Sequence, residues 1–132
     1  ILAWSLDTII AQRLVRKICE NCKTEIEKTP EEINLIQAMI KDIWMKWLKA
    51  ENIKLYKWCG CELCNNSWYK WRIWIYEIMS LNEELREMIR EWQNWEEIIA
   101  QARKMDMITM REDGFLKAFK WYTTLQEVMR VI

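Results

Sequence analysis

The sequence contains no histidine, only two glycines and a single proline among its 132 residues. Without histidine, it has no His-based general base, no histidine-activated nucleophile and no imidazole metal ligand. It also has no Gly-x-x-x-x-Gly-Lys-Ser/Thr segment, so no loop here can hold a nucleotide's phosphates in the P-loop manner. These absences exclude several common catalytic motifs from the stretch and favour a binding or structural role.

Charge imbalance and long apolar runs are also missing. Twenty basic and twenty acidic residues give a net charge of zero, so no global field attracts nucleic acid or an anionic membrane. No apolar run approaches the roughly 18 residues of a membrane span, and no signal peptide is visible. We expect one domain over residues 1–132 and a cytoplasmic location. The start at Ile1 instead of Met suggests that an N-terminal part is missing.

Four of the five cysteines form two C-x-x-C clips, Cys19-x-x-Cys22 and Cys61-x-x-Cys64. Each clip places two thiolates on one turn, which is half of a closed Cys₄ zinc site. We therefore predict a structural Zn²⁺ held by Cys19, Cys22, Cys61 and Cys64. Cys59 is expected to be a spectator, because four thiolates already close such a site. A redox protein with reactive C-x-x-C thiols is the alternative reading of the same spacing.

The pattern along the chain predicts mainly helices with a small β element. Apolar spacing predicts a helix over residues 5–17, which runs into the first clip. A second helix, starting at a Thr-Pro-Glu-Glu cap and running over about residues 30–50, fills most of the 38 residues (23–60) between the clips. Short β segments are expected at 54–56 and 69–79, followed by helices to the end.

Cap signals and apolar stripes mark the C-terminal helices. Reciprocal caps are expected at Ser80/Glu83, Asn94/Glu97, Thr109/Glu112 and Thr123/Gln126. Gly114 is expected to weaken the third of these helices locally. The stripes are interpreted as core: Leu85, Met88, Ile89, Ile98, Ile99, Ala102, Met110, Phe115 and Phe119.

Basic residues near the first clip leave two readings open. Arg13, Arg16 and Lys17, beside Gln12, could bind phosphate or a partner's carboxylates, or they could form a solvated helix face. Paired glutamates such as those at 31/32, 83/84 and 96/97 lie at helix starts, where the helix dipole explains them without a catalytic role.

Several segments, taken in order, resemble the traffic ATPases of type II secretion and type IV pilus assembly. They are 11–22 (AQRLVRKICENC), 61–65 (CELCN), 69–77 (YKWRIWIYE), 107–114 (MITMREDG) and 123–128 (TTLQEV). The resemblance covers nearly the whole chain and is weakest over about 32–51. It implies the C-terminal subdomain of a RecA-like ATPase, in which cysteines matching Cys19, Cys22, Cys61 and Cys64 bind zinc.

The resemblance also implies how this chain is divided into segments and which functions belong to the rest of a larger protein. It implies a linking helix over 1–18, a zinc-clip region over 19–64, a β element over 65–79 and C-terminal helices over 80–132. Walker motifs, ATP and Mg²⁺ would belong to a missing upstream core, so the fragment itself hydrolyses nothing. The implied parent is a ring-forming ATPase at the cytoplasmic face of the inner membrane, whose partners are neighbouring subunits and the membrane platform protein.

Some questions remain open at this level. No nucleic-acid partner is expected, yet a stand-alone zinc-binding interaction or nucleic-acid module is the rival reading. The resemblance also leaves open whether the system secretes protein, builds pili or takes up DNA.

Tryptophan is as abundant as glycine is scarce, with ten residues against two. At roughly 7% usage, a chain of this length would carry about nine glycines. Six tryptophans stand where the family pattern has glycine: Trp58, Trp68, Trp71, Trp74, Trp92 and Trp121. Our hypothesis is an alternative genetic code in which UGA encodes glycine but has been translated as tryptophan. Trp4, Trp44, Trp47 and Trp95 stay undecided.

A real aromatic surface is the alternative explanation of the tryptophans. Trp68, Trp71 and Trp74 could then form a stacking platform beside Lys70 and Arg72, as in proteins that bind single-stranded nucleic acid. The balanced charge argues against this reading.

Overall fold

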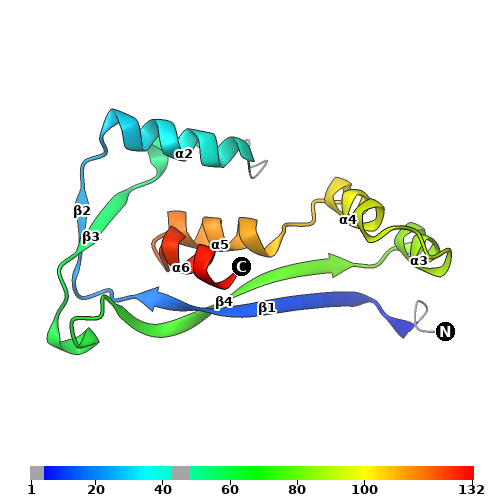
Figure 1. Ribbon diagram of the computed structural model, residues 1–132, viewed down its shortest axis with the longest axis horizontal. Helices are drawn as coiled ribbons and strands as arrows, with labels where there is room; N and C mark the ends of the chain where they lie inside the picture. Colours follow the sequence, from blue (N-terminus) through cyan, green and yellow to red (C-terminus); the bar gives the residue numbers. More distant parts are fainter. Residues whose placement is uncertain (1–4, 43–47) are drawn as a thin grey trace.

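The computed structural model describes residues 5–42 and 48–132. Two antiparallel ribbons and five α-helices make up this described part of the chain (Figure 1). The strands are β1 (Thr8–Ile18), β2 (Lys23–Ile26), β3 (Leu55–Trp58) and β4 (Tyr69–Ser80). The helices are α2 (Pro30–Asp42), α3 (Glu83–Arg90), α4 (Trp95–Lys104), α5 (Met110–Phe119) and α6 (Leu125–Val131).

The long ribbon pairs β1 with β4, in register from Thr8 opposite Ser80 to Ile18 opposite Tyr69. The helix predicted over residues 5–17 is therefore wrong, and the predicted link over 1–18 contains a strand in place of that helix. Val15 in β1 and Ile75 in β4 are both fully buried beneath the helices. The segment is rich in β-branched residues, which suit a pleated surface, and it finds a partner strand about 60 residues further along the chain.

A β-bulge interrupts this ribbon near the clips. The register shifts between Arg16 and Ile18, where Lys17 alone faces both Lys70 and Trp71. The extra residue increases the local twist of the strand.

The short ribbon pairs β2 with β3, from Lys23 opposite Trp58 to Ile26 opposite Leu55. Its second strand confirms the short β segment expected near 54–56, whereas β2, only four residues long, was not anticipated. The ribbon rises from the clips and carries α2 at its far end (Figure 1).

Helix α2 starts where the cap signal predicts. The Thr29 N–H donates to Glu32 Oε2 at 2.8 Å, and the Glu32 N–H donates to Thr29 Oγ1 at 3.3 Å. The helix is described to Asp42, short of the predicted end near residue 50, and the chain returns through a 3₁₀ turn at Ala50–Asn52. Part of the predicted helix, 43–47, lies outside the described residues, as do Trp4, Trp44 and Trp47.

The C-terminal helices follow the predicted caps in part. Asn94 caps α4, and Thr109 forms a full reciprocal cap with Glu112 on α5. Two predictions were wrong by one or two residues, because Asn82 caps α3 and Thr124 caps α6.

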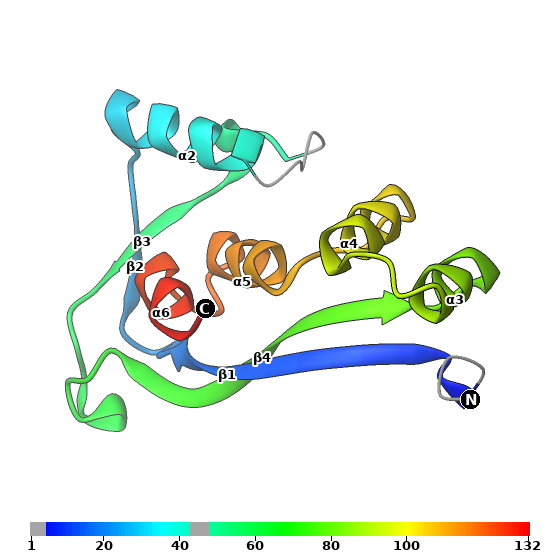
Figure 2. The ribbon, with the colours of Figure 1, turned by 45° about the vertical axis from the view of Figure 1, so that its right-hand side comes forward.

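Apart from the cysteine group, the apolar side chains of the described residues gather in two clusters, which contain five of the residues interpreted as core. The larger joins α2 and its returning 3₁₀ turn to α5 and α6 through Ile36, Ile40, Ala50, Ile53, Phe115, Ala118, Phe119 and Val128. The smaller joins the end of β4 to α3 and α4 through Met79, Leu81, Leu85, Ile98 and Ala102. In Figure 2 the helices α3 and α4 accordingly lie at one end of the long ribbon, and α5 and α6 lie toward the other.

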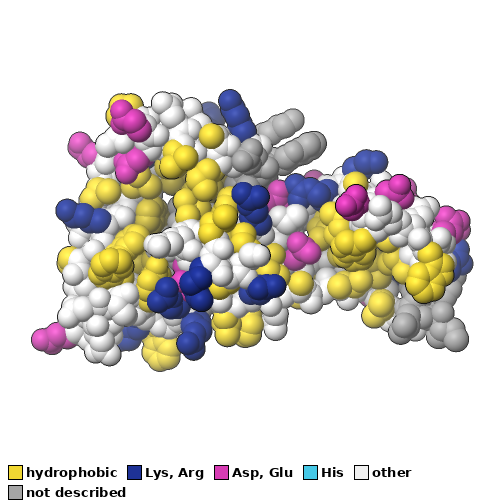
Figure 3. All heavy atoms as spheres, viewed as in Figure 1, with side chains coloured by type: hydrophobic (Ala, Val, Ile, Leu, Met, Phe, Trp, Pro, Cys, Tyr) yellow, Lys and Arg dark blue, Asp and Glu magenta, His cyan; other side chains and the backbone are white. Residues whose placement is uncertain are grey.

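The surface view agrees with a chain of balanced charge. Basic side chains gather over the middle of the face in Figure 3, and several acidic side chains lie toward its two ends. Within the described residues, no helix has the length and apolar character needed to cross a membrane. The expectation of a helical fold with a small β element is confirmed at this level.

Candidate metal centre

The two clips meet at the junction of the ribbons. The first clip connects β1 to β2, and the second connects β3 to β4, so both ribbons leave from the same point (Figure 1). The sulfur atoms of Cys19, Cys22, Cys61 and Cys64 all lie within 4.8 Å of one another. Cysteines 42 residues apart in the sequence are thus brought together as a single group positioned to bind a metal ion.

The sulfur spacing fits a tetrahedral metal. The Sγ–Sγ distances are 3.7 Å for Cys19–Cys61, 3.9 Å for Cys22–Cys64 and 3.7 Å for Cys61–Cys64. A tetrahedron with Zn–S bonds near 2.3 Å has edges of about 3.8 Å. Cys19, Cys22 and Cys64 are almost fully buried, and Cys61 is half-buried. Four thiol sulfurs in a closed, largely dry site match the donor set of structural zinc sites.

Backbone geometry explains how the second clip folds. The N–H groups of Cys64 and Asn66 donate to the carbonyl of Cys61 at 3.2 and 3.0 Å, which closes a tight turn. Gly60, before this turn, has φ +82°, and a Cβ there would meet Asn66 Oδ1 at 2.9 Å. Glycine is therefore needed at position 60 for both its conformation and its lack of a side chain.

The thiols experience opposite local influences. A hydrogen bond from the Asn21 side chain contributes most to lowering the pKa of Cys61 to about 6. Burial raises the pKa of Cys22 to about 12. A divalent cation would offset the charge of four thiolates, and its binding would release protons from the thiols.

Cys59 lies outside the group. It is exposed, and its sulfur donates to the backbone carbonyl of Cys22 at 3.8 Å. This placement agrees with its expected role as a spectator.

The basic residues before the first clip are engaged within the molecule. Arg16 Nη2 lies 2.7 Å from Glu127 Oε2, and Arg13 Nη1 donates to the carbonyl of Val131. Lys17 pairs with Glu20 at 3.3 Å. Sequence reasoning missed Glu127, whose side chain is buried, because a glutamate in the first turn of a helix is usually a solvated dipole partner.

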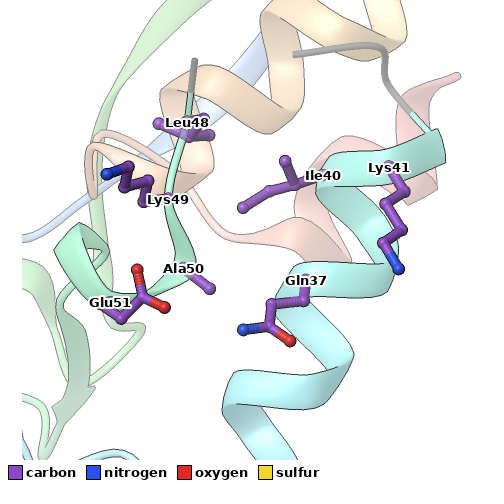
Figure 4. Close-up of a pocket in the computed structure, with 7 residues that line it drawn as sticks. All are labelled: Gln37, Ile40, Lys41, Leu48, Lys49, Ala50 and Glu51. Atoms are coloured by element: carbon purple, nitrogen blue, oxygen red, sulfur yellow. The ribbon is translucent and has the colours of Figure 1, made fainter. Parts of the chain in front are cut away.

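A cavity separate from the cysteines lies between α2 and the returning chain (Figure 4). Its volume is about 610 Å³, and its lining combines Ile40 and Leu48 with the charged Lys41, Lys49 and Glu51. Among the described residues this lining contains no cysteine, serine or threonine, so the cavity offers no thiol or hydroxyl nucleophile there.

Comparison with known proteins places the chain in a family. A model of the family described as "Type II/IV secretion system protein" matches residues 1–130. The type IV pilus assembly ATPase PilB of Pseudomonas aeruginosa is 42% identical over 130 residues, which is 98% of this chain and 22% of that protein.

Relatives from both kinds of system match. The PilB of Thermus thermophilus is 37% identical over 121 residues, 92% of this chain and 13% of that protein. The type II secretion system ATPase E of Vibrio cholerae is 31% identical over 131 residues, 99% of this chain and 24% of that protein. The chain thus spans a quarter or less of these relatives, and on the extent of the family match it belongs to the type II/IV secretion system protein family.

Proposed function

We propose that this chain is the C-terminal zinc-binding part of a type II secretion or type IV pilus assembly ATPase. Cys19, Cys22, Cys61 and Cys64 would hold one Zn²⁺ in a structural role. The observation that carries this proposal is the meeting of the four sulfur atoms within 4.8 Å at the junction of both ribbons. An upstream RecA-like core, which would hold ATP and Mg²⁺, belongs to the same proposal.

The metal's role follows from its place in the fold. Zinc would tie the end of β1 to the start of β4 and would also fix the base of the β2–β3 ribbon. That ribbon carries α2 onto α5 and α6, where Ile36 and Ile40 enter the larger apolar cluster. Zinc-finger peptides bind their metal with about 10–16 kcal/mol, which exceeds the net stability of many domains. Metal binding would therefore set the geometry of the whole unit.

The role of the parent protein rests on its relatives. The matched proteins are named as type IV pilus assembly and type II secretion ATPases. We infer a parent that assembles as a ring on the cytoplasmic side of the inner membrane. In it, this unit would contact neighbouring subunits and the membrane platform protein.

The redox and stand-alone alternatives have less support. A C-x-x-C redox protein needs one reactive pair, whereas here two pairs share one cluster with sulfur separations of 3.7–3.9 Å. A free-standing zinc or nucleic-acid module would not need similarity to secretion ATPases along nearly its whole length.

Metal analysis and thermal melting of the full-length protein test the proposal. We expect one zinc per chain, together with a clear drop in melting temperature after chelation. Cys22→Ser should lose the zinc and the stability it confers, because a three-thiolate site is open and weaker. Cys59→Ser is the matched control and should retain both.

Two outcomes would contradict the zinc proposal. One is a purified full-length protein without zinc, and the other is a Cys22→Ser variant that keeps a full equivalent of it.

A further inference from the structure

Seven non-glycine residues have positive φ in the described part of the chain. Three are Asn65, Asn66 and Asp106, and four are Trp68 (φ 69°), Trp71 (74°), Trp92 (57°) and Trp121 (62°). Asparagine and aspartate tolerate the left-handed region, whereas a bulky side chain there is a genuine outlier. Four of the seven described tryptophans thus occupy a conformation that suits glycine.

Helix α3 ends in a complete Schellman motif with tryptophan at its left-handed position. The Trp92 N–H donates to the carbonyl of Ile89 at 3.2 Å, and the Gln93 N–H donates to the carbonyl of Met88 at 3.1 Å. In this motif the left-handed residue is usually glycine.

Helix α5 ends in the same way. The Trp121 N–H donates to the carbonyl of Ala118 at 3.0 Å, and the Tyr122 N–H donates to the carbonyl of Lys117 at 2.9 Å. Helix α4, between them, ends in a third such motif, but its left-handed residue is Asp106. Three helices therefore end in the same Schellman motif. Only in α4 is the left-handed position occupied by a non-glycine residue, Asp106, that tolerates this conformation.

Trp71 lies in the β-bulge of the long ribbon. It is one of the two residues that face Lys17, and its φ of 74° is left-handed. A bulge residue in this conformation is typically glycine.

Trp68 supports the cysteine cluster through its backbone. Its carbonyl accepts the N–H of Cys19 at 2.9 Å, and its own N–H donates to the sulfur of Cys64. With φ at 69°, one residue serves both clips at once. Both contacts are made by the backbone of residue 68, so neither of them uses the indole ring.

The indoles of Trp121 and Trp68 make edge-on ring contacts with Tyr56 and Trp58, at 4.9 and 6.1 Å between ring centroids. The indoles of Trp71 and Trp92 lie mostly in solvent. Trp92 is 93% exposed and Trp71 is 77% exposed. The indole Nε1 of Trp121 is buried and, among the described residues, has no hydrogen-bond partner. A buried donor without a partner costs free energy, and large aromatic rings are seldom left in solvent.

We propose that residues 68, 71, 92 and 121 are glycines in the protein as its cell makes it, encoded by UGA codons. UGA differs by one base from the tryptophan codon UGG and by one base from the glycine codon GGA. If the cell reads UGA as glycine, a translation table that assigns UGA to tryptophan shows tryptophan at each of these positions. The backbone carries this inference whatever the function of the protein.

The proposal removes an apparent binding surface and assigns a positioning role. Without indoles at 68 and 71, the stacking platform for single-stranded nucleic acid loses two of its three rings. The glycine at position 68 becomes a positioning residue for Cys19 and Cys64. Trp58 and Trp74 lie in β3 and β4 and do not have positive φ, so the backbone gives no reason for glycine there.

The gene and the native protein give the direct test. We expect UGA at codons 68, 71, 92 and 121, and we expect peptides from the full-length native protein to carry glycine at these positions in tandem mass spectrometry. UGG codons, or peptides carrying tryptophan there, would overturn the proposal.

Recombinant full-length variants give a second measurement. Trp92→Gly should raise the melting temperature, because it relieves a strained helix end and removes only an exposed ring. Trp121→Gly relieves the same strain but loses the ring contact with Tyr56, so its gain should be smaller. Trp95→Gly is the matched control: Trp95 is exposed, begins α4 and does not have positive φ, so this change should lower the melting temperature.

A fall in melting temperature for Trp92→Gly and Trp121→Gly like that of the control would contradict the proposal. Zinc content should stay the same in all three variants, which separates this test from the test of the metal site.

Discussion

At the scale of single residues, Gly114 shows what a local pattern cannot reveal. Its position inside a helix predicts only a weakened turn. In the structure, α6 crosses α5 at this point, and a Cβ on residue 114 would lie 2.5 Å from Val128 Cγ1. The glycine therefore permits a close contact between α5 and α6. No local pattern around Gly114 predicts this contact with Val128.

Gly114→Ala should destabilise the protein despite the better helix propensity of alanine. The added methyl group must displace Val128, which is fully buried. Overpacking of this kind costs about 1–3 kcal/mol, against a propensity gain of about 1 kcal/mol. Chemical denaturation of both proteins measures the difference. Val128→Ala should make room, so the double variant should lose less than the sum of the single changes, and simple additivity would contradict the clash.

At the scale of elements, helix starts were predicted more reliably from short-range cap signals than strands were from the apolar pattern. The Thr29 and Thr109 caps were predicted correctly because both bonding partners lie within four residues. The strand β1 was mistaken for a helix because its partner β4 is remote, and only the pairing shows which of its faces is buried. The α3 cap was placed at Ser80, but β4 extends through that residue.

The two candidate caps of α3 can be separated by mutation. Asn82 Oδ1 accepts the N–H of Leu85 at 2.9 Å, whereas Ser80 is the last residue of β4. Asn82→Ala should cost about 1 kcal/mol of stability, because an N–H at the helix start loses its acceptor. Ser80→Ala should change stability by less than about 0.5 kcal/mol. Equal losses in urea unfolding would mean that the cap is wrongly assigned.

At the scale of the whole molecule, the meeting of the four cysteines was the most predictable feature. Each C-x-x-C clip is local, and the chemistry of four thiols left few alternatives. The contact between Arg16 and Glu127 was not predictable from local patterns, because 111 residues separate the two side chains. Long-range ion pairs need the three-dimensional path of the chain.

Acid should weaken the fold through its buried carboxylates. Hydrogen bonds from Arg130 and then Arg16 lower the pKa of Glu127, and a hydrogen bond from Arg103 contributes to lowering the pKa of Glu112 against the effect of burial. A carboxyl with a lowered native pKa stabilises the fold fully above its unfolded pKa of about 4.3, and this stability is lost as the pH falls further. Melting temperature should therefore drop as the pH falls below about 5.

Glu127→Gln provides the check on this pH dependence. The variant should be less stable than the parent at pH 7, and its loss of stability between about pH 5 and pH 3 should be smaller. Glu87→Gln is the control, since Glu87 pairs with Arg90 at the surface, where ion pairs contribute little. An acid response in Glu127→Gln as steep as in the parent would assign the effect to other groups.

The contact between β1 and α6 also has a consequence for folding during synthesis, because the two elements are made at different times. Ribosomes add about 5–20 residues per second, so Glu127 emerges roughly 5–20 seconds after Arg16. Until β4 has been made, β1 has no partner strand, and until α6 has been made that helix cannot help to cover Val15 and Ile18, which are buried in the finished fold. The nascent chain would therefore expose an unpaired, β-branched strand until β4 has been added. An unpaired strand edge exposed in this way is prone to aggregation.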